Sequence, residues 1–290
     1  MQRSTISVAC RVATLIGLCS MAGIPWVRAM AAPLEICHAD SLAGPMRGLQ
    51  HAFEAQHPGV TIHLTSGVSR DLAARILKGD VCDVFAPSSP AVIDQDLFGR
   101  KAVGTDRDAA TWYVVFSANE MVVITAKGNP LRIGRVRDLG RPEVTVARVT
   151  GTTDLATNRT LEFIKRATAL ESAPELAQTI IDKAPMDPAK PTGIPDVVSA
   201  VGDGRASAGI VYYSAAVAAR SDVDVIRFAD SVNRSEAIRN AATVPATARN
   251  AGDAVAFVAF LLTPEARRIL QDAGQPPIVP AIRRGDVPFR

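Results

Sequence analysis

The sequence predicts an α/β protein with two lobes, each built on a doubly wound, mostly parallel sheet flanked by helices. Two observations lead to this prediction. Strand-like and helix-like segments alternate in two series along the 290 residues, and a β-rich stretch separates the series. In the first series a serine follows each strand segment, at Ser41, Ser69 and Ser88. The carboxyl ends of parallel strands share one edge of a sheet, where ligands bind, so these serines are expected to lie together.

The first series alternates three strands with three helices. Met46, Leu49 and Phe53 recur at helical spacing, and Pro58 lies just beyond the end of that helix. The predicted strands are residues 34–38, 60–64 and 81–86, and the predicted helices are residues 46–56, 71–78 and 91–98.

The second series follows two β-rich runs, residues 112–116 and 121–126, which a polar segment separates. Apolar helices near the C-terminus are expected to return and pack on the first lobe. The predicted strands are residues 144–149, 208–212 and 223–228, the last of these being the final strand of the chain, and the predicted helices are residues 158–170, 174–183, 194–201, 214–219, 251–262 and 264–273.

The two series imply that the chain crosses between the lobes twice. The first crossing is expected near residues 116–121 and the second near Arg227. The first lobe then consists of residues 32–117 and 228–290, and the second of residues 118–227.

The N-terminus predicts a secretory signal peptide over residues 1–31. Arg3 and Arg11 supply positive charge, residues 12–24 form an apolar core, and Ala29-Met30-Ala31 fits a cleavage site. The alternative is a membrane anchor, for which the apolar run is too short. We therefore expect a mature protein exported to the periplasm.

Composition and charge argue against a nucleic-acid partner. Aromatic residues make up only 5% of the chain, too few for a base-stacking surface. The predicted signal peptide contains three arginines and no acidic residues. Its removal therefore leaves 29 of the 32 basic residues, which equals the 29 acidic residues of the chain. A monomer with no net charge and no basic surface is expected.

Two cysteines, Cys37 and Cys82, remain after the predicted cleavage. Export allows a disulfide between them, but two buried thiols fit their position in predicted strands equally well. The histidines and cysteines lack the spacing of a metal site. The sequence also contains no Gly-x-Ser-x-Gly elbow, Walker loop or Gly-x-Gly-x-x-Gly fingerprint, so no enzyme and no cofactor is expected.

The serine turns predict an anion site. Ser41 and Ser69 each stand between a strand and a helix, where hydroxyl and free backbone N–H groups meet the positive end of a helix. The alternative is that each serine merely caps its helix.

Five segments recur in the order and spacing of a known family: ADSL at residues 39–42, GVSRDLAARI at 67–76, CDVFA at 82–86, NEMVVI at 119–124 and AGIVYYSAA at 208–216. In these segments the chain resembles the molybdate- and tungstate-binding periplasmic proteins of ABC transporters. The resemblance implies a type II periplasmic-binding-protein fold, whose two lobes close over one oxyanion. It also implies delivery of that anion to a membrane permease.

The resemblance also implies site residues. Ser41 and Ser69 match two serine donors, Ile194 matches a backbone donor at a helix start, and Tyr212 matches a tyrosine donor, with Tyr213 as the competing residue. These groups would hold the metal of molybdate or tungstate through its oxygens. Another backbone donor is expected in the turn that follows residue 149.

Four further residues are weaker candidates for ligand contact: Ser88, Asp154, Arg159 and Arg70. Asp154 stands where the family has a small residue, and Arg159 is similar to an arginine of the tungstate-binding branch. These departures leave the ligand open between molybdate, tungstate and another small anion such as sulfate, phosphate or an organic carboxylate. A secreted serine hydrolase or a ligand-sensing domain is a further alternative.

The charge of the ligand sets one more expectation. Molybdate carries no proton near neutral pH, so its site needs donors only, and a carboxylate in the shell is costly. Asp40 and Asp154 are therefore expected to point away, cap a helix or pair with a base. If either enters the site, the expectation is that molybdate is not the ligand.

Overall fold

The computed structural model describes residues 32–152 and 154–289, so the predicted signal peptide lies outside the described residues. The first series forms a parallel sheet of order β2-β1-β3, in which Ile36 of β1 pairs with Leu64 on one side and Val84 on the other. Its elements are β1 (Leu34–Ala39), η1 (Asp40–Leu42), α1 (Ala43–Gln56), β2 (Ile62–Gly67), α2 (Ser69–Leu77), β3 (Val84–Ala86) and α3 (Pro90–Asp96). This confirms the predicted α/β order.

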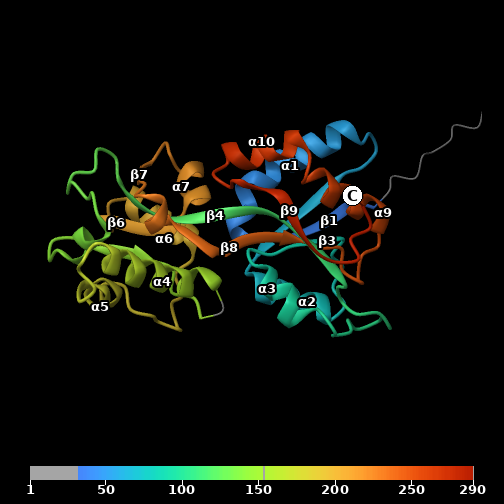
Figure 1. Cartoon of the computed structure of the whole chain (residues 1–290), viewed down its shortest axis with the longest axis horizontal. Helices are drawn as coiled ribbons and strands as arrows, with labels where there is room; N and C mark the ends of the chain where they lie inside the picture. Colours follow the sequence, from blue (N-terminus) through green and yellow to red (C-terminus); the bar gives the residue numbers. More distant parts are fainter. Residues whose placement is uncertain (1–31, 153, 290) are drawn as a thin grey trace, which may run out of the picture. The chain divides into compact units, whose positions relative to one another are not determined.

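The long strand β4 (Trp112–Ala126) corrects one prediction, because the two β-rich runs are a single strand (Figure 1). The polar segment between them lies within the strand and is largely buried. Asn240 Nδ2 donates to Ser117 Oγ at 2.9 Å, and Asn119 Nδ2 donates to Ser214 Oγ at 2.8 Å. Register shifts between residues 115 and 117 and between 118 and 120 let the strand bend there without ending.

The second series forms a sheet of order β5-β6-β4-β7, and this sheet is mixed rather than mostly parallel. β5 and β6 are parallel, but β4 runs antiparallel to both β6 and β7 because it enters from the first series as a crossing strand. Its elements are η2 (Val136–Gly140), β5 (Val146–Arg148), α4 (Leu155–Leu170), α5 (Leu176–Asp182), α6 (Ile194–Gly202), β6 (Ala208–Tyr212), α7 (Tyr213–Ala218), β7 (Val223–Ile226) and α8 (Asp230–Asn233).

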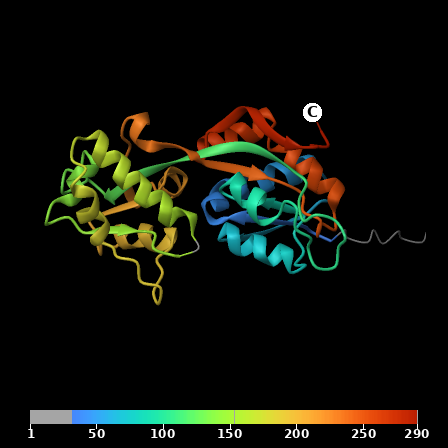
Figure 2. The ribbon, with the colours of Figure 1, turned by 60° about the horizontal axis from the view of Figure 1, so that its bottom comes forward.

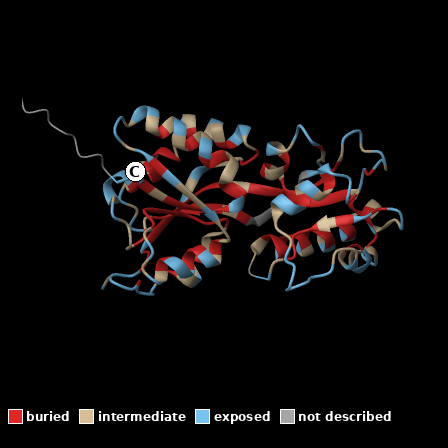
Figure 3. Cartoon of the chain, turned by 180° about the vertical axis from the view of Figure 1, so that it is seen from behind, coloured by how far each residue is buried: buried red, intermediate tan, exposed pale blue. Residues whose placement is uncertain are grey.

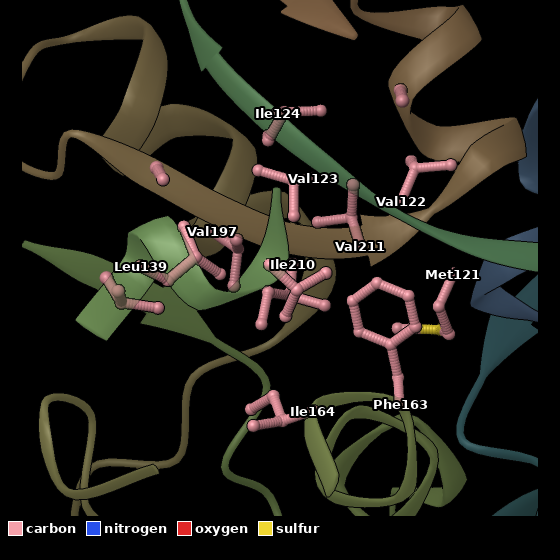
Figure 4. Packing of buried hydrophobic residues seen from close by; sticks show 14 of the residues in the cluster. Met121, Val122, Val123, Ile124, Leu139, Phe163, Ile164, Val197, Ile210 and Val211 are labelled. Carbon is pink, nitrogen blue, oxygen red and sulfur yellow. The ribbon is translucent and has the colours of Figure 1, made fainter. Parts of the chain in front are cut away.

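The core of this second sheet is aliphatic. Val123 of β4, Ile210 of β6 and Phe163 of α4 are all buried and lie within one packed cluster (Figure 4). Burial of such side chains stabilises the fold by about 1.5–3 kcal/mol each.

Two strands follow β7, so the prediction that residues 223–228 are the final strand is wrong. β8 (Arg234–Ala242) and β9 (Pro277–Gly285) both pair antiparallel with β4. β8 runs beside β4 between the two sheets (Figure 2). β9 lacks the apolar alternation of a half-buried strand, because it contains two prolines and two arginines. Its pairing with β4 therefore decides its conformation.

The C-terminal helices α9 (Ala251–Phe260) and α10 (Pro264–Asp272) pack on the first sheet, as predicted. The ring of Phe53 on α1 meets those of Phe257 and Phe260 edge-on, at centroid distances of 5.2 and 5.5 Å. Asp83, which is fully buried, accepts hydrogen bonds from the backbone N–H groups of Glu35, at 2.8 Å, and of Asn250, also at 2.8 Å. These bonds tie the start of α9 to the edge of the sheet.

The buried clusters divide along the chain. One cluster contains only residues between 121 and 238, and the other two contain residues before 117 and after 240. Figure 3 shows buried strands in both groups, with exposed faces on the covering helices. The lobe boundaries given above stay a prediction. Within the described residues, no helix is long and apolar enough to cross a bilayer.

Candidate functional site

One small cavity gathers the three serines that follow β1, β2 and β3. Ser41 lies in η1, Ser69 is the first residue of α2, and Ser88 lies between β3 and α3. About 20 Å³ is open to the centre of a water-sized sphere, and the cavity adjoins a larger groove of about 340 Å³. The cavity is lined by Ala39, Asp40, Ser41, Gly67, Val68, Ser69, Ser88, Asp154, Leu155, Ile194 and Tyr212.

Two side chains fix the main-chain carbonyl of Ser41 by hydrogen bonds. It accepts hydrogen bonds from Ser214 Oγ at 3.1 Å and from Gln275 Nε2 at 2.7 Å, and all three residues are buried. No described residue forms a hydrogen bond with the Ser41 hydroxyl, and neither η1 nor α1 has a side-chain cap. Ser41 therefore does not cap its helix, and its hydroxyl is available to a ligand.

Ser69 also fails to cap its helix. The N-cap residue of α2 is Val68, which supplies no side-chain bond. The Ser69 hydroxyl instead accepts the backbone N–H of Ser88 at 3.2 Å and lies 3.5 Å from the Ser88 hydroxyl. Ser89, the next residue, is the one that caps α3, through the N–H of Ala91. We call Ser41, Ser69 and Ser88 the serine side of the cavity.

The opposite side begins with two helix starts. Ile194 is the first residue of α6 and Leu155 is the first residue of α4, and both line the cavity. The first N–H groups of a helix have no partner within it, and they carry the positive end of the helix dipole. Leu155 lies where the backbone donor expected after residue 149 would be placed. The sequence prediction missed it because it began that helix at residue 158, although Asp154 is a typical N-cap.

Tyr212, the last residue of β6, brings a hydroxyl to this side, whereas Tyr213, the first residue of α7, does not line the cavity. The Tyr212 oxygen accepts a hydrogen bond from Arg159 Nη1 at 2.7 Å. Burial raises the pKa of the Tyr212 phenol, and the charge of Arg159 opposes that rise. The phenol therefore keeps its proton at neutral pH and can donate it to an anion. The ring of Tyr213 lies under Arg227 instead, 4.5 Å from the guanidinium carbon.

Arg159 connects the two sides of the cavity. It is 7% exposed, and its guanidinium donates to the Ser88 carbonyl at 2.6 Å and to the Ser88 hydroxyl at 3.3 Å. It does not line the cavity, so it acts on the site through Ser88 and Tyr212. It places a positive charge behind both hydroxyls.

Asp154 and Asp40 both line the cavity, contrary to the expectation that they point away. Asp154 caps α4 as one alternative predicted, accepting the Ala156 N–H at 2.8 Å. Asp40, which is exposed, accepts the hydroxyl of Ser66. Burial raises the pKa of the Asp154 carboxyl above its ordinary value. We call the lining residues Asp154, Leu155, Ile194 and Tyr212, together with Arg159 behind them, the charged side of the cavity.

Arg70 is not brought to the cavity. Its guanidinium forms an ion pair with Asp96 of α3, with Nη1–Oδ2 at 3.0 Å, and also donates to Gln95 at 3.0 Å. Direct contact with the anion, as weakly predicted for Arg70, is therefore not supported by its position. The alternation of the sequence could not reveal this, because the partner lies on a separate helix.

The two cysteines, Cys37 and Cys82, are free and buried. The alternative of two buried thiols is therefore confirmed, and burial raises the pKa of the Cys82 thiol. In the part of the chain that the structure describes, no group of three or more histidine, cysteine, aspartate or glutamate residues is placed to hold a metal ion. No histidine lines the cavity.

The protein has two sheets that share crossing strands, and a cavity lined by hydrogen-bond donors lies at the ends of the strands. These features are typical of the class of solute-binding proteins. The chain belongs to the family of bacterial extracellular solute-binding proteins, which matches residues 34–275. This confirms the family that the sequence segments indicated.

Particular relatives bind oxyanions. Over 250 residues the chain is 28% identical to the molybdate-binding protein ModA of Mycobacterium tuberculosis, and the match covers 84% of each chain. The periplasmic molybdate-binding protein of Azotobacter vinelandii has a TM-score of 0.64 at 16% identity, covering 85% of this chain and 99% of that one. The sulfate-binding protein SubI of Mycobacterium tuberculosis has a TM-score of 0.65 at 18% identity, covering 86% and 88%. These structures establish the type II periplasmic-binding-protein fold.

Proposed function

We propose that this protein captures a small tetrahedral oxyanion, molybdate or tungstate, and delivers it to the permease of an ABC transporter. One observation supports this proposal above the others. A single cavity joins the hydroxyls of Ser41, Ser69, Ser88 and Tyr212 to the first residues of α2, α4 and α6. Neutral donors and helix dipoles can replace the hydration shell of an anion with little reorganisation.

The lining of the cavity favours an inorganic ligand. Four hydroxyls and three helix starts surround the cavity, which suits an anion that presents oxygens on every side. Molybdate and tungstate are almost equal in size, so the same donors would hold either. The name of the Mycobacterium tuberculosis relative supports molybdate, and the sulfate-binding structural neighbour keeps sulfate as an alternative.

A serine hydrolase is disfavoured by the surroundings of the serines. The nearest candidate base in sequence, His38, uses Nδ1 for the carbonyl of Ala39 and does not line the cavity. Burial also lowers the pKa of His38. A nucleophilic serine needs a base within hydrogen-bond reach, and the lining residues offer no histidine to Ser41 or Ser69.

We further propose that the protein works outside the cytoplasm, with residues 1–31 as its export signal. Residues 32–117 with 228–290 and residues 118–227 would act as lobes that close on the ligand about β4 and β8. The closed form would then be the state that the permease recognises. Small-angle X-ray scattering with and without ligand tests closure, which should lower the radius of gyration.

Isothermal titration against molybdate, tungstate, sulfate and phosphate tests the ligand. Molybdate and tungstate should bind most tightly, and Ser69→Ala should weaken binding by about 10–100-fold through loss of one hydrogen bond to a charged group. Ser89→Ala is the matched control, because that hydroxyl caps α3 and does not line the cavity. The proposal fails if none of the four anions produces heat with the wild-type protein.

A second candidate keeps the fold and changes the anion. The position of Asp154 on the cavity favours a ligand that carries a proton, such as hydrogen phosphate, over one that carries none. Native mass spectrometry of protein purified without added ligand separates the cases, since bound phosphate, sulfate, molybdate and tungstate differ in mass. An organic adduct would overturn the inorganic assignment.

A further inference from the structure

The carboxylate of Asp154 has an unused oxygen at the ligand cavity. Oδ1 accepts the N–H of Ala156, and no described residue donates a hydrogen bond to Oδ2. Asp154 lines both the small cavity and the larger groove beside it, which has a volume of about 340 Å³. It therefore lies where the small cavity and the larger groove meet.

The groups that face Asp154 are mostly acidic. Burial raises the pKa of the Asp154 carboxyl most, and the N–H of Ala156 lowers it. The charge of Asp40 on η1 raises this pKa, that of Arg159 on its own helix lowers it, and that of Asp71 on α2 raises it less. The charge of Asp154 in turn raises the pKa of the Tyr212 phenol on β6.

The remaining element beside Asp154 is α6, with the loop that leads into it. Asp196 of α6 uses Oδ2 to hold the N–H of Gly193 at 2.8 Å. The other charged residues of that loop, Asp187 and Lys190, are exposed. No described cation therefore forms an ion pair with Asp154, because Arg159 is engaged with Ser88 and Tyr212.

An ionised carboxylate and a fully deprotonated oxyanion both accept hydrogen bonds and neither donates one. Two such groups in a cavity of this size repel each other unless a proton lies between them. We propose that Asp154 makes anion binding a one-proton event, so that the complex holds one proton shared between Asp154 and a ligand oxygen. This inference rests on the proposed function, and it revises the expectation that an aspartate in the site excludes molybdate.

The source of the proton depends on the ligand. A ligand without protons, such as sulfate or molybdate, binds together with one proton from solvent, which the Asp154 carboxylate takes up. Hydrogen phosphate brings its own proton and donates it to the Asp154 carboxylate, so no proton is taken from solvent. In both cases the oxygen–oxygen contact becomes a hydrogen bond and the charge within the cavity is the same.

Titration calorimetry in buffers of different ionisation enthalpy counts the protons. Between about pH 6 and pH 8, the affinity for sulfate and for molybdate should fall about tenfold per pH unit, with one proton taken up. Sulfate carries no proton anywhere in this range, so its slope belongs to the protein. Phosphate at about pH 8, mainly the singly protonated dianion, should bind without proton uptake.

Asp154→Asn is the decisive variant, because asparagine keeps the N-cap and replaces the carboxylate by a neutral amide. It should bind sulfate and molybdate independently of pH, at least tenfold more tightly than the wild type at about pH 8, and should bind phosphate more weakly. Asp71→Asn is the matched control: it removes the same charge from a residue that does not line the small cavity. It should keep the proton uptake and the pH slope.

The outcomes separate this inference from the function on which it rests. If no anion binds to the wild-type protein, the proposed function fails and the inference fails with it. If molybdate or sulfate binds to the wild type without proton uptake and without a pH slope, the proposed function stands and the inference is overturned. Proton uptake that persists in Asp154→Asn would also overturn it, because another group would then carry the proton.

Discussion

The two sides of the cavity differ in charge, and we propose a different role in anion binding for each. The serine side is neutral, and short bonds fix it, such as the 2.7 Å bond from Gln275 to the Ser41 carbonyl. The charged side holds an aspartate and, behind the lining residues, an arginine that donates to the hydroxyl and the carbonyl of Ser88. Neutral donors suit any tetrahedral anion, whereas on our proposal the charged side decides the protonation of the bound anion. Arg159 links the two sides through its bonds to Ser88.

The largest effect is expected where the charged side reaches the serine side. Arg159→Met removes the bonds to Ser88 and to the Tyr212 hydroxyl, so anion affinity should fall by about 100-fold, equivalent to about 3 kcal/mol. Titration calorimetry gives the affinity, and scattering of the ligand-saturated protein should show a larger radius of gyration. Arg166→Met, on the same helix with a carbonyl partner at Val232, should leave affinity unchanged.

Variants of the two adjacent tyrosines test which hydroxyl of the charged side contacts the anion. Tyr212→Phe removes one donor to the anion and the acceptor of Arg159, so affinity should fall by about tenfold. Tyr213→Phe should have no effect on affinity, because its ring packs under Arg227 and away from the cavity. Equal losses in both variants would contradict the assignment of Tyr212.

Adjacent serines separate ligand binding from helix capping on the serine side. Ser88→Ala should weaken anion binding several-fold, and about tenfold at most, because its hydroxyl lines the cavity and meets Arg159. Ser89→Ala should instead lower the free energy of unfolding by about 1 kcal/mol, through loss of the α3 cap, with affinity unchanged. Calorimetric titration and urea unfolding of both variants give the two quantities, and reversed results would disprove the assignment.

The smallest effect concerns the stability of the ligand-free protein. Burial raises the pKa of Asp154 above its value in the unfolded chain, so the folded state binds this proton more readily. The contribution of Asp154 to stability is therefore favourable below the unfolded pKa and is lost as pH rises through the folded pKa. Asp154→Asn should raise the free energy of unfolding near pH 7 by at most about 1 kcal/mol, with no gain at low pH. A loss of stability near pH 7 would show that Asp154 is not destabilising there.

Much of the cavity was predictable because its serine side follows from local pattern. Three strands of one parallel sheet end at one edge, so the residues after them meet whatever the details of packing. Ser41, Ser69 and Ser88 occupy those positions. Ile194 and Tyr212 were placed by resemblance to a family, and the structure brings both to the same cavity.

Other features escaped because they depend on distant partners. β9 has prolines and arginines and forms a strand only because β4 offers it a hydrogen-bonding edge. The continuity of β4 through its polar residues was not predicted, since burial of Ser117 and Asn119 requires Asn240 and Ser214 from remote segments. The early start of α4 at Leu155 was missed for a local reason, the N-cap role of Asp154.

The sequence by itself determined the alternation of strands and helices, the family and the serine side of the cavity. The alternation and the serine turns depend on residue spacing within single strands, turns and helices, and the family depends on the order and spacing of five short segments. Only the tertiary structure decided that Asp154 lines the cavity, that Arg159 binds Ser88, which is 71 residues away, and that Arg70 turns to Asp96. The physical reason is that a charged side chain takes the partner that long-range packing brings within reach, and local spacing carries no record of that partner.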